Sequence, residues 1–165
     1  MNIRLINDLN AEGARDALLK CCGSERWAEL MTQSRPFGSE DEVIRAADQS
    51  FAKMTRADWL EAFAAHPKIG NVESLRKKYA DTKTWAQSEQ SGVNGTSEEV
   101  LQGLAQANKD YEEKFGHIFI VCATGKTAEE MLSILNERLR HDLELEFGNA
   151  AAEQKKITLL RLEKL

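Results

Sequence analysis

The sequence predicts an all-α fold, a single-domain bundle of roughly seven to nine helices. A hydroxyl residue followed three positions later by Glu, the spacing typical of a helix start, occurs at Ser39, Thr96 and Thr127. Apolar residues at steps of three and four follow each of these starts. Alternating strand patterns are scarce, and the β-branched stretch from Ile118 to Cys122 is too isolated to form a sheet. We therefore expect this stretch to be a buried extended loop.

The apolar positions place the helices in chain order. They are Trp27, Leu30 and Met31; Val43, Ala47 and Phe51; Trp59, Leu60 and Phe63; Val100, Leu104, Ala107, Tyr111 and Phe115; Met131, Leu135 and Leu139; and Ile157 and Leu160 with Arg161. Each set defines one face to bury, which is typical of a bundle around a shared core. Pro67 disfavours helical geometry in the residue before it, so the third of these helices should end near Ala65.

Composition bounds the class of protein. The 165 residues, of which 42% are hydrophobic, suit one globular domain spanning residues 1–165. The net charge of −5 argues against nucleic-acid and anionic-membrane partners, which attract basic faces. The longest apolar stretch, Ile118 to Ala123, is too short to cross a bilayer, and the N-terminus lacks the pattern of a signal peptide.

Cysteine usage favours a reducing compartment. The chain has three cysteines, and the adjacent pair Cys21 and Cys22 is poorly placed for a structural disulfide. The terminal Glu163-Lys164-Leu165 matches a peroxisomal address only in part. We therefore expect a cytoplasmic location.

His66 is a candidate catalytic residue because it lies where a helix ends, which exposes its imidazole. The alternative is that it only complements the negative end of the helix dipole. Glu89 and Gln90 offer a carboxylate and an amide for a polar heterocycle, or they belong to a solvated helix face. The apolar segment from Phe115 to Ala123 has backbone groups that could bind an amide-rich ligand, or it crosses the core.

A metal site is not expected. The three histidines, His66, His117 and His141, lack the spacing of metal ligands. A phosphate-binding loop ending at Gly125 is also excluded, because the motif needs a glycine where this chain has Ile120.

Taken in order, several motifs resemble the 2-oxo-4-hydroxy-4-carboxy-5-ureidoimidazoline (OHCU) decarboxylase family. They are Cys21-Cys22-Gly23-Ser24 with Trp27, Arg35-Pro36-Phe37, His66-Pro67-Lys68-Ile69-Gly70, Ser88-Glu89-Gln90-Ser91-Gly92, Asn108 to Tyr111, Phe115-Gly116-His117-Ile118-Phe119-Ile120 and Glu137-Arg138-Leu139. The ordered set covers nearly the whole chain.

The resemblance implies an all-α, dimeric enzyme that converts OHCU to (S)-allantoin and CO2 without a metal or organic cofactor. His66 matches the family's catalytic histidine, and Glu89 is implied as the second catalytic group and principal carboxylate. The implied substrate-binding positions are Pro67, Ala86, Gln87, Ser88, Glu89, Gln90, Phe119, Ile120, Val121, Cys122, Ala123 and Arg138. The implied partners are this small-molecule substrate and a second copy of the chain.

The chain departs from the family pattern at two positions. Ala86 stands where the family often has a hydroxyl residue, and His117 stands where it often has an aromatic one. The first departure puts one expected hydrogen bond to the substrate in question. Ser88, two positions on, offers a hydroxyl group that could replace it. Cys122 is expected to be structural.

Two other functions remain open from the residues themselves. Trp27, Trp59 and Trp85 could line a groove for a partner helix, which would make the chain an interaction module. A lyase or hydrolase acting on another ureido compound would also suit the same fold and pocket.

Overall fold

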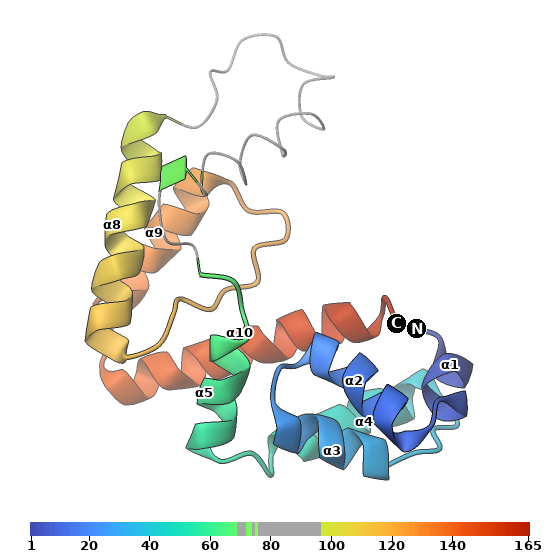
Figure 1. Cartoon of the computed structure of the whole chain (residues 1–165). Coiled ribbons are helices and arrows are strands. Elements are labelled where there is room, and N and C mark those ends of the chain that lie inside the picture. The colour runs from blue at the N-terminus through green and yellow to red at the C-terminus, as the bar shows by residue number, and fades with distance from the viewer. Residues whose placement is uncertain (69–71, 74, 76–96) are drawn as a thin grey trace, which may run out of the picture. The chain divides into compact units, whose positions relative to one another are not determined.

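The computed structural model describes residues 1–68, 72, 73, 75 and 97–165. These residues contain eight main helices and no strand (Figure 1), which confirms the all-α prediction. The helices are α1 (Ile3–Asp8), α2 (Ala11–Cys21), α3 (Glu25–Gln33), α4 (Glu40–Phe51), α5 (Arg56–Ala64), α8 (Glu98–Phe115), α9 (Ala128–Arg138) and α10 (Leu143–Leu162). None of these described helices is both long and apolar enough to span a membrane.

The chain divides into two compact units. Unit 1 consists of Met1–His66, Ile120–Cys122 and Gly148–Leu165, and unit 2 consists of Pro67–Phe119 and Ala123–Phe147. The long helix α10 therefore contributes its first residues to unit 2 and the rest to unit 1. The expectation of a single domain stays a prediction.

Helix starts follow the capping signals, with one correction. The hydroxyls of Ser39 and Thr127 accept the backbone N–H three residues on, and Thr127 forms a reciprocal capping box. Helix α8, however, is capped by Ser97 and not by the predicted Thr96. With Ser97 as the cap, Glu98 and Glu99 both fall in the first turn, where the helix dipole favours negative charge.

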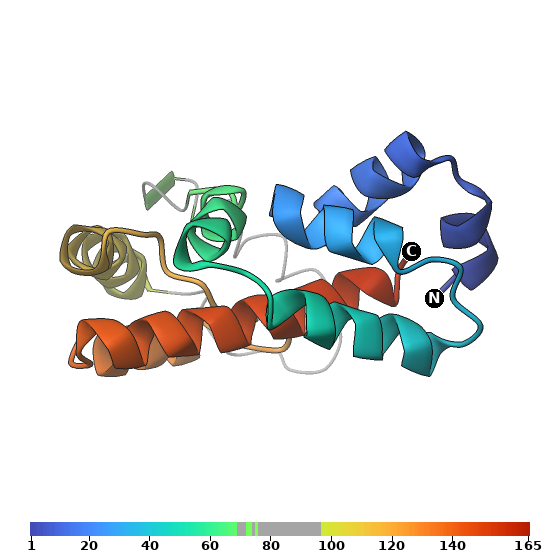
Figure 2. The ribbon, with the colours of Figure 1, turned by 90° about the horizontal axis from the view of Figure 1, so that it is seen from below.

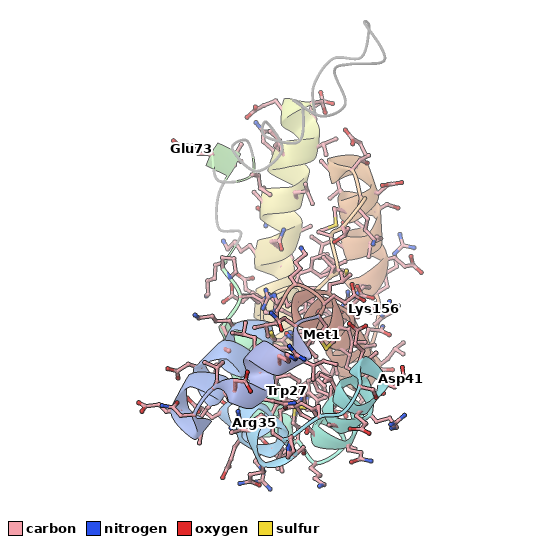
Figure 3. All side chains as sticks on the ribbon, turned by 90° about the vertical axis from the view of Figure 1, so that its right-hand side faces the viewer. Met1, Trp27, Arg35, Asp41, Glu73 and Lys156 are labelled. Atoms are coloured by element: carbon pink, nitrogen blue, oxygen red, sulfur yellow. The ribbon has the colours of Figure 1, made fainter. Side chains whose placement is uncertain are left out.

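The core of unit 1 is built on aromatic side chains that the helical spacing had singled out. Trp27 is fully buried, stacks on Phe51 with ring centroids 5.4 Å apart, and lies within the packed helices of this unit in Figure 3. Phe51 in turn stacks on Trp59 at 5.3 Å. Because Trp27 and Trp59 are core residues, they do not line a partner groove; Trp85 lies outside the described residues.

Polar contacts and α10 close unit 1. The Asn7 side chain donates to the carbonyl of Phe37 and accepts its N–H, which ties the loop after α3 to α1. Lys155 of α10 lies over the Phe51 ring of α4, 5.4 Å from its centroid. The N- and C-termini, both in this unit, lie close together in Figures 1 and 2.

Unit 2 is centred on the pair formed by α8 and α9, which lie side by side in Figure 1. Leu104 and Tyr111 of α8 are buried, as are Met131 and Leu135 of α9, as the spacing predicted. Gly103 allows close approach, because a Cβ there would lie 3.1 Å from Leu132. The predicted helical faces are thus the packed faces.

Candidate active site

His66 follows the last turn of α5. The helix ends at Ala64 with Ala65 as its cap, as the effect of Pro67 predicted. The imidazole is half-buried, and its Nε2 lies 2.7 Å from Oε1 of Gln154 on α10. The pairing joins two residues of unit 1 that are far apart in the chain.

The surroundings of His66 favour its neutral form. Burial lowers the pKa of His66 below its ordinary value of 6.5, and the positive charge of Arg161 lowers it further, while the bond to Gln154 opposes both. A neutral imidazole interacts only weakly with a helix dipole. The imidazole is therefore uncharged at neutral pH and can accept a proton; its catalytic role stays a prediction.

The turn between α2 and α3 packs closely on the end of α5. A Cβ built on Gly23 would lie 2.2 Å from the Cβ of Ala65, closer than such atoms approach in proteins. Ala65 directly precedes His66, so this contact helps to fix where the imidazole begins. Position 23 therefore needs glycine, because any side chain there would clash with Ala65.

Gly23→Ala is expected to lower the free energy of unfolding by about 1–3 kcal/mol, the usual result of overpacking. Adding Ala65→Gly removes the clashing methyl group, so the double variant should be more stable than Gly23→Ala alone. Gly148→Ala is a matched control, because nothing lies within 4 Å of its added Cβ and alanine favours a helix. Urea denaturation measures all three; a double variant no better than Gly23→Ala would show that the Ala65 contact is unimportant.

Arg161 is a charged neighbour of His66 that the sequence placed on a helix but did not propose for the site. Its Nη1 lies 3.3 Å from the backbone oxygens of Lys20 and Cys21, to which it donates at the end of α2. The same guanidinium acts on the His66 imidazole. The sequence feature that could have indicated Arg161 is its position as the one cation in an otherwise apolar turn of the last predicted helix.

The predicted backbone segment Ile120–Cys122 belongs to unit 1 and contains no strand, in agreement with the expected loop. Ile120 is buried, while Val121 and Cys122 are half-buried. The N–H of Cys122 donates to the carboxylate of Glu153 at 2.7 Å. Glu153 and its neighbour Gln154 thus hold this segment and His66, respectively, so α10 brings these two predicted parts of the site together.

Arg138, a predicted substrate contact in unit 2, is almost fully buried in a polar network. Its Nε donates to Oε1 of Glu146 at 2.7 Å, and its guanidinium lies 4.7 Å from the ring centroid of Phe119. The hydroxyl of Tyr111 also donates to Oε1, and Nδ1 of His141 lies 2.9 Å from Oε2. These contacts give Arg138 a structural partner; its contact with substrate stays a prediction.

Hydrogen bonds keep the buried carboxylate of Glu146 charged. Burial alone would raise its pKa, but the bonds from Arg138, Tyr111 and His141 outweigh burial and lower it. Burial and the same carboxylate raise the pKa of Tyr111. The network is therefore an ion pair with a neutral phenol.

The imidazole of His117 packs against aromatic side chains in the way that an aromatic ring would. It is buried and meets Tyr111 edge-on at 5.6 Å and Phe147 at 6.1 Å between ring centroids. An imidazole can pack in this way where the family often has an aromatic residue. This departure therefore leaves the local packing of unit 2 intact.

The other predicted site residues are placed as follows. Pro67 is exposed and Ala123 half-buried, both in unit 2. The positions Ala86, Gln87, Ser88, Glu89 and Gln90 lie outside the described residues. Within the described ranges, no three His, Cys, Asp or Glu side chains form a group that could hold a metal ion.

A protein-family model described as OHCU decarboxylase matches residues 7–163. The chain belongs to the OHCU decarboxylase family. A crystal structure of an OHCU decarboxylase in the presence of (S)-allantoin is similar to it, with 40% sequence identity and a TM-score of 0.72, covering 90% of this chain and 96% of that one.

Curated relatives agree with this family. The chain is 44% identical over 147 residues to the uric acid degradation bifunctional protein TTL of Arabidopsis thaliana, covering 88% of this chain and 45% of that protein. It is 27% identical over 163 residues to the OHCU decarboxylase of Haloferax volcanii, covering 98% of this chain and 94% of that one. The chain thus spans less than half the length of the Arabidopsis relative.

In this OHCU decarboxylase family member, Cys21 and Cys22 are buried and form no disulfide. Burial raises the pKa of each of these two thiols to about 11. Both are therefore protonated at neutral pH and make poor nucleophiles. His66 differs from these thiols, because burial lowers its pKa below the ordinary value of 6.5 and leaves its neutral imidazole able to accept a proton.

Proposed function

We propose that the chain catalyses decarboxylation of OHCU to (S)-allantoin and CO2, and that it does so without a cofactor. The observation that carries the proposal is the half-buried His66, held by Gln154 with its pKa lowered, at the position of the family's catalytic histidine. Membership of the family and the likeness to an OHCU decarboxylase solved with (S)-allantoin support the choice of substrate.

The substrate can act as its own electron sink. Its carboxylate is attached to a ring carbon that is bonded to a C=N carbon. When the C–CO2 bond breaks, its electron pair forms a C=C bond, and the imine π pair moves to nitrogen, which takes a proton from solvent. A simple carboxylate would need pyridoxal or thiamine to accept this charge. The protein then has to supply orientation and proton transfer.

We assign His66 to the proton transfers that complete the reaction. Its neutral imidazole takes the hydroxyl proton from the enol-like intermediate as the allantoin carbonyl forms. The imidazolium then delivers a proton to the adjacent ring carbon, whose C=C electron pair forms the new C–H bond. Delivery from one side sets the stereocentre, whereas free water approaches both faces.

The remaining assignments concern binding. Glu89 is proposed to hold the 4-hydroxyl group, and backbone groups near Ile120 and Val121 to bind the ureido and ring amides. The N–H of Cys122 already donates to Glu153, so the proposed ligands are other backbone groups of this segment. Pro67, Ala86 to Gln90 and Arg138 complete the proposed substrate contacts.

The direct test adds purified chain to freshly generated urate-oxidation intermediates and follows CO2 release. We expect a rate that rises in proportion to chain concentration and falls when substrate is consumed. Chain carrying His66→Asn is the matched control. A release rate equal to the buffer rate would reject the proposal, and turnover of another ureido compound in its place would favour the related lyase or hydrolase.

Glu89→Gln is expected to lower kcat, because the variant keeps the shape of the side chain and removes its charge. If the carboxylate orients the 4-hydroxyl in the transition state, kcat and kcat/KM should fall together. Steady-state kinetics with OHCU measures both. An unchanged kcat with a raised KM would limit Glu89 to ground-state binding, and unchanged values of both would remove it from the site.

We also propose that the chain is a cytoplasmic homodimer. The resemblance to the family supports the dimer, and the unpaired buried thiols suit a reducing compartment. Sedimentation equilibrium tests the dimer: a mass of twice 18.5 kDa is expected, and a mass of 18.5 kDa at micromolar concentration would contradict it.

A further inference from the structure

We propose that Gln154 and Thr158 are positioning residues that fix the tautomer of His66, with the proton on Nε2 and the lone pair on Nδ1. The assignment of Nδ1 as the nitrogen that meets the substrate rests on the proposed function. The tautomer itself does not, because it follows from hydrogen bonds inside unit 1.

The network begins at the Thr158 hydroxyl. Its single proton is donated to the backbone oxygen of Gln154 one turn earlier, at 2.9 Å. The Thr158 oxygen is then an acceptor for its other neighbours, and it receives the side-chain N–H of Gln154 at 3.2 Å. The amide nitrogen of Gln154 therefore faces Thr158.

The amide oxygen is thereby turned toward His66. Oε1 of Gln154 has no proton, so at 2.7 Å from the imidazole it accepts a hydrogen bond that Nε2 of His66 must donate. In a neutral imidazole only one nitrogen carries a proton. Nδ1 is consequently the nitrogen left with a free lone pair.

Burial makes this orientation hard to reverse. Gln154 and Thr158 are both fully buried, so water is not at hand to satisfy a rotated amide. Reversal would point the amide N–H groups at Nε2 and would require the Thr158 hydroxyl to leave the backbone oxygen of Gln154. The nearby Cys22 thiol also lies within hydrogen-bonding reach of the Thr158 hydroxyl.

The residues of α10 that face His66 therefore do more than pack: they also set the orientation and the charge state of its imidazole. Arg161, one turn beyond Thr158, is the charged group that acts on His66, and Cys21 and Cys22 are the buried thiols that feel the same guanidinium. A neutral amide at position 154 accepts the Nε2 proton without adding a negative charge that would stabilise the imidazolium. Gln154 therefore sets orientation while leaving the imidazole neutral.

The tautomer is tested by ¹⁵N NMR on full-length chain carrying ¹⁵N-labelled histidine, with His66→Asn used to assign its signals. At pH 7.5 we expect the His66 Nε2 signal of a protonated nitrogen and the Nδ1 signal of an unprotonated one. In Thr158→Val the amide is free to rotate, and the two signals should move toward each other. Thr158→Ser, which keeps the hydroxyl, should retain the wild-type pattern. A protonated Nδ1 in the wild-type chain would overturn the proposal.

Kinetics then separate positioning from folding. Thr158→Val is expected to lower kcat by roughly 10- to 100-fold, the size of effect found when a partner that orients a metal-binding histidine is removed, with little change in KM. Thr158→Ser should restore kcat. Gln154→Glu still accepts from Nε2 but adds charge, so the acid limb of kcat/KM should move to higher pH. Unchanged kcat in Thr158→Val together with the altered NMR pattern would show that tautomer control does not matter to turnover.

Different results would contradict the proposed function and the proposed tautomer of His66. If the chain does not decarboxylate OHCU, the NMR pattern still reports the tautomer. If the chain is active but Nδ1 carries the proton, the function stands and the positioning roles of Gln154 and Thr158 are rejected.

Discussion

Replacing His66 with alanine or asparagine is expected to lower kcat for OHCU decarboxylation by about 10²- to 10⁴-fold, the range of general acid–base effects. The side chain is half-buried at the end of α5, so its removal should leave the helical content intact. Initial rates at saturating substrate measure the loss, and far-ultraviolet circular dichroism checks the fold. Near-normal turnover by a folded variant would remove His66 from the mechanism.

The pH dependence of the wild-type chain follows from the same side chain. If His66 acts as the proposed base, kcat/KM should fall as the pH drops through its pKa. Burial and Arg161 lower that pKa, so the acid limb should lie below the ordinary value of 6.5. Folding disfavours the imidazolium, so this residue should also reduce stability as the pH falls below 6.5. An acid limb centred above 6.5 would contradict the assignment.

Arg138→Met is expected to lower the free energy of unfolding by about 3–5 kcal/mol, because it leaves the carboxylate of Glu146 buried without its cation. Glu146 is fully buried and Arg138 nearly so. Urea denaturation measures the effect. Arg26→Met is the matched control, because the Arg26–Glu29 pair is exposed and should contribute less than about 1 kcal/mol.

The partner variant and pH distinguish an ion pair from simple packing. Replacing both members, Arg138→Met with Glu146→Met, should recover part of the lost stability, because no buried charge is then unpaired. Since the pKa of Glu146 is lowered, its stabilising contribution is present above its ordinary value of 4.5 and is lost at more acid pH. If folded Arg138→Met instead keeps wild-type stability and shows a raised KM, Arg138 serves the substrate and not the fold.

The predictable part of the fold came from short-range rules. Capping at Ser39 and Thr127, the helix end before Pro67 and the buried positions of α4, α8 and α9 all depend on residues within a few positions of one another. The wrong cap at Thr96 arose because two adjacent hydroxyl residues compete, and the Thr-x-x-Glu spacing favoured the first of them. The capping box from Thr55 to Asp58 does not match the Ser/Thr-x-x-Glu spacing, because an aspartate stands at the third helical position.

The site was less predictable, because its polar contacts are long-range. His66 and Gln154 are 88 positions apart, and no local pattern indicates that a glutamine on an amphipathic helix faces an imidazole. In the sequence, Glu146 looks like an ordinary exposed acidic residue near a helix start. In the structure it is fully buried, and Arg138, Tyr111 and His141 form hydrogen bonds with its carboxylate. His66 was predicted as a catalytic residue from the order of the family motifs, because composition alone does not distinguish it from the other histidines.

The most direct test of the account is the optical activity of allantoin formed from fresh urate-oxidation intermediates. Circular dichroism at a wavelength where allantoin absorbs should show a signal of the (S) enantiomer that grows with wild-type chain and does not exceed the uncatalysed level with His66→Asn. Racemic allantoin in the presence of active wild-type chain would contradict one-sided proton delivery by His66.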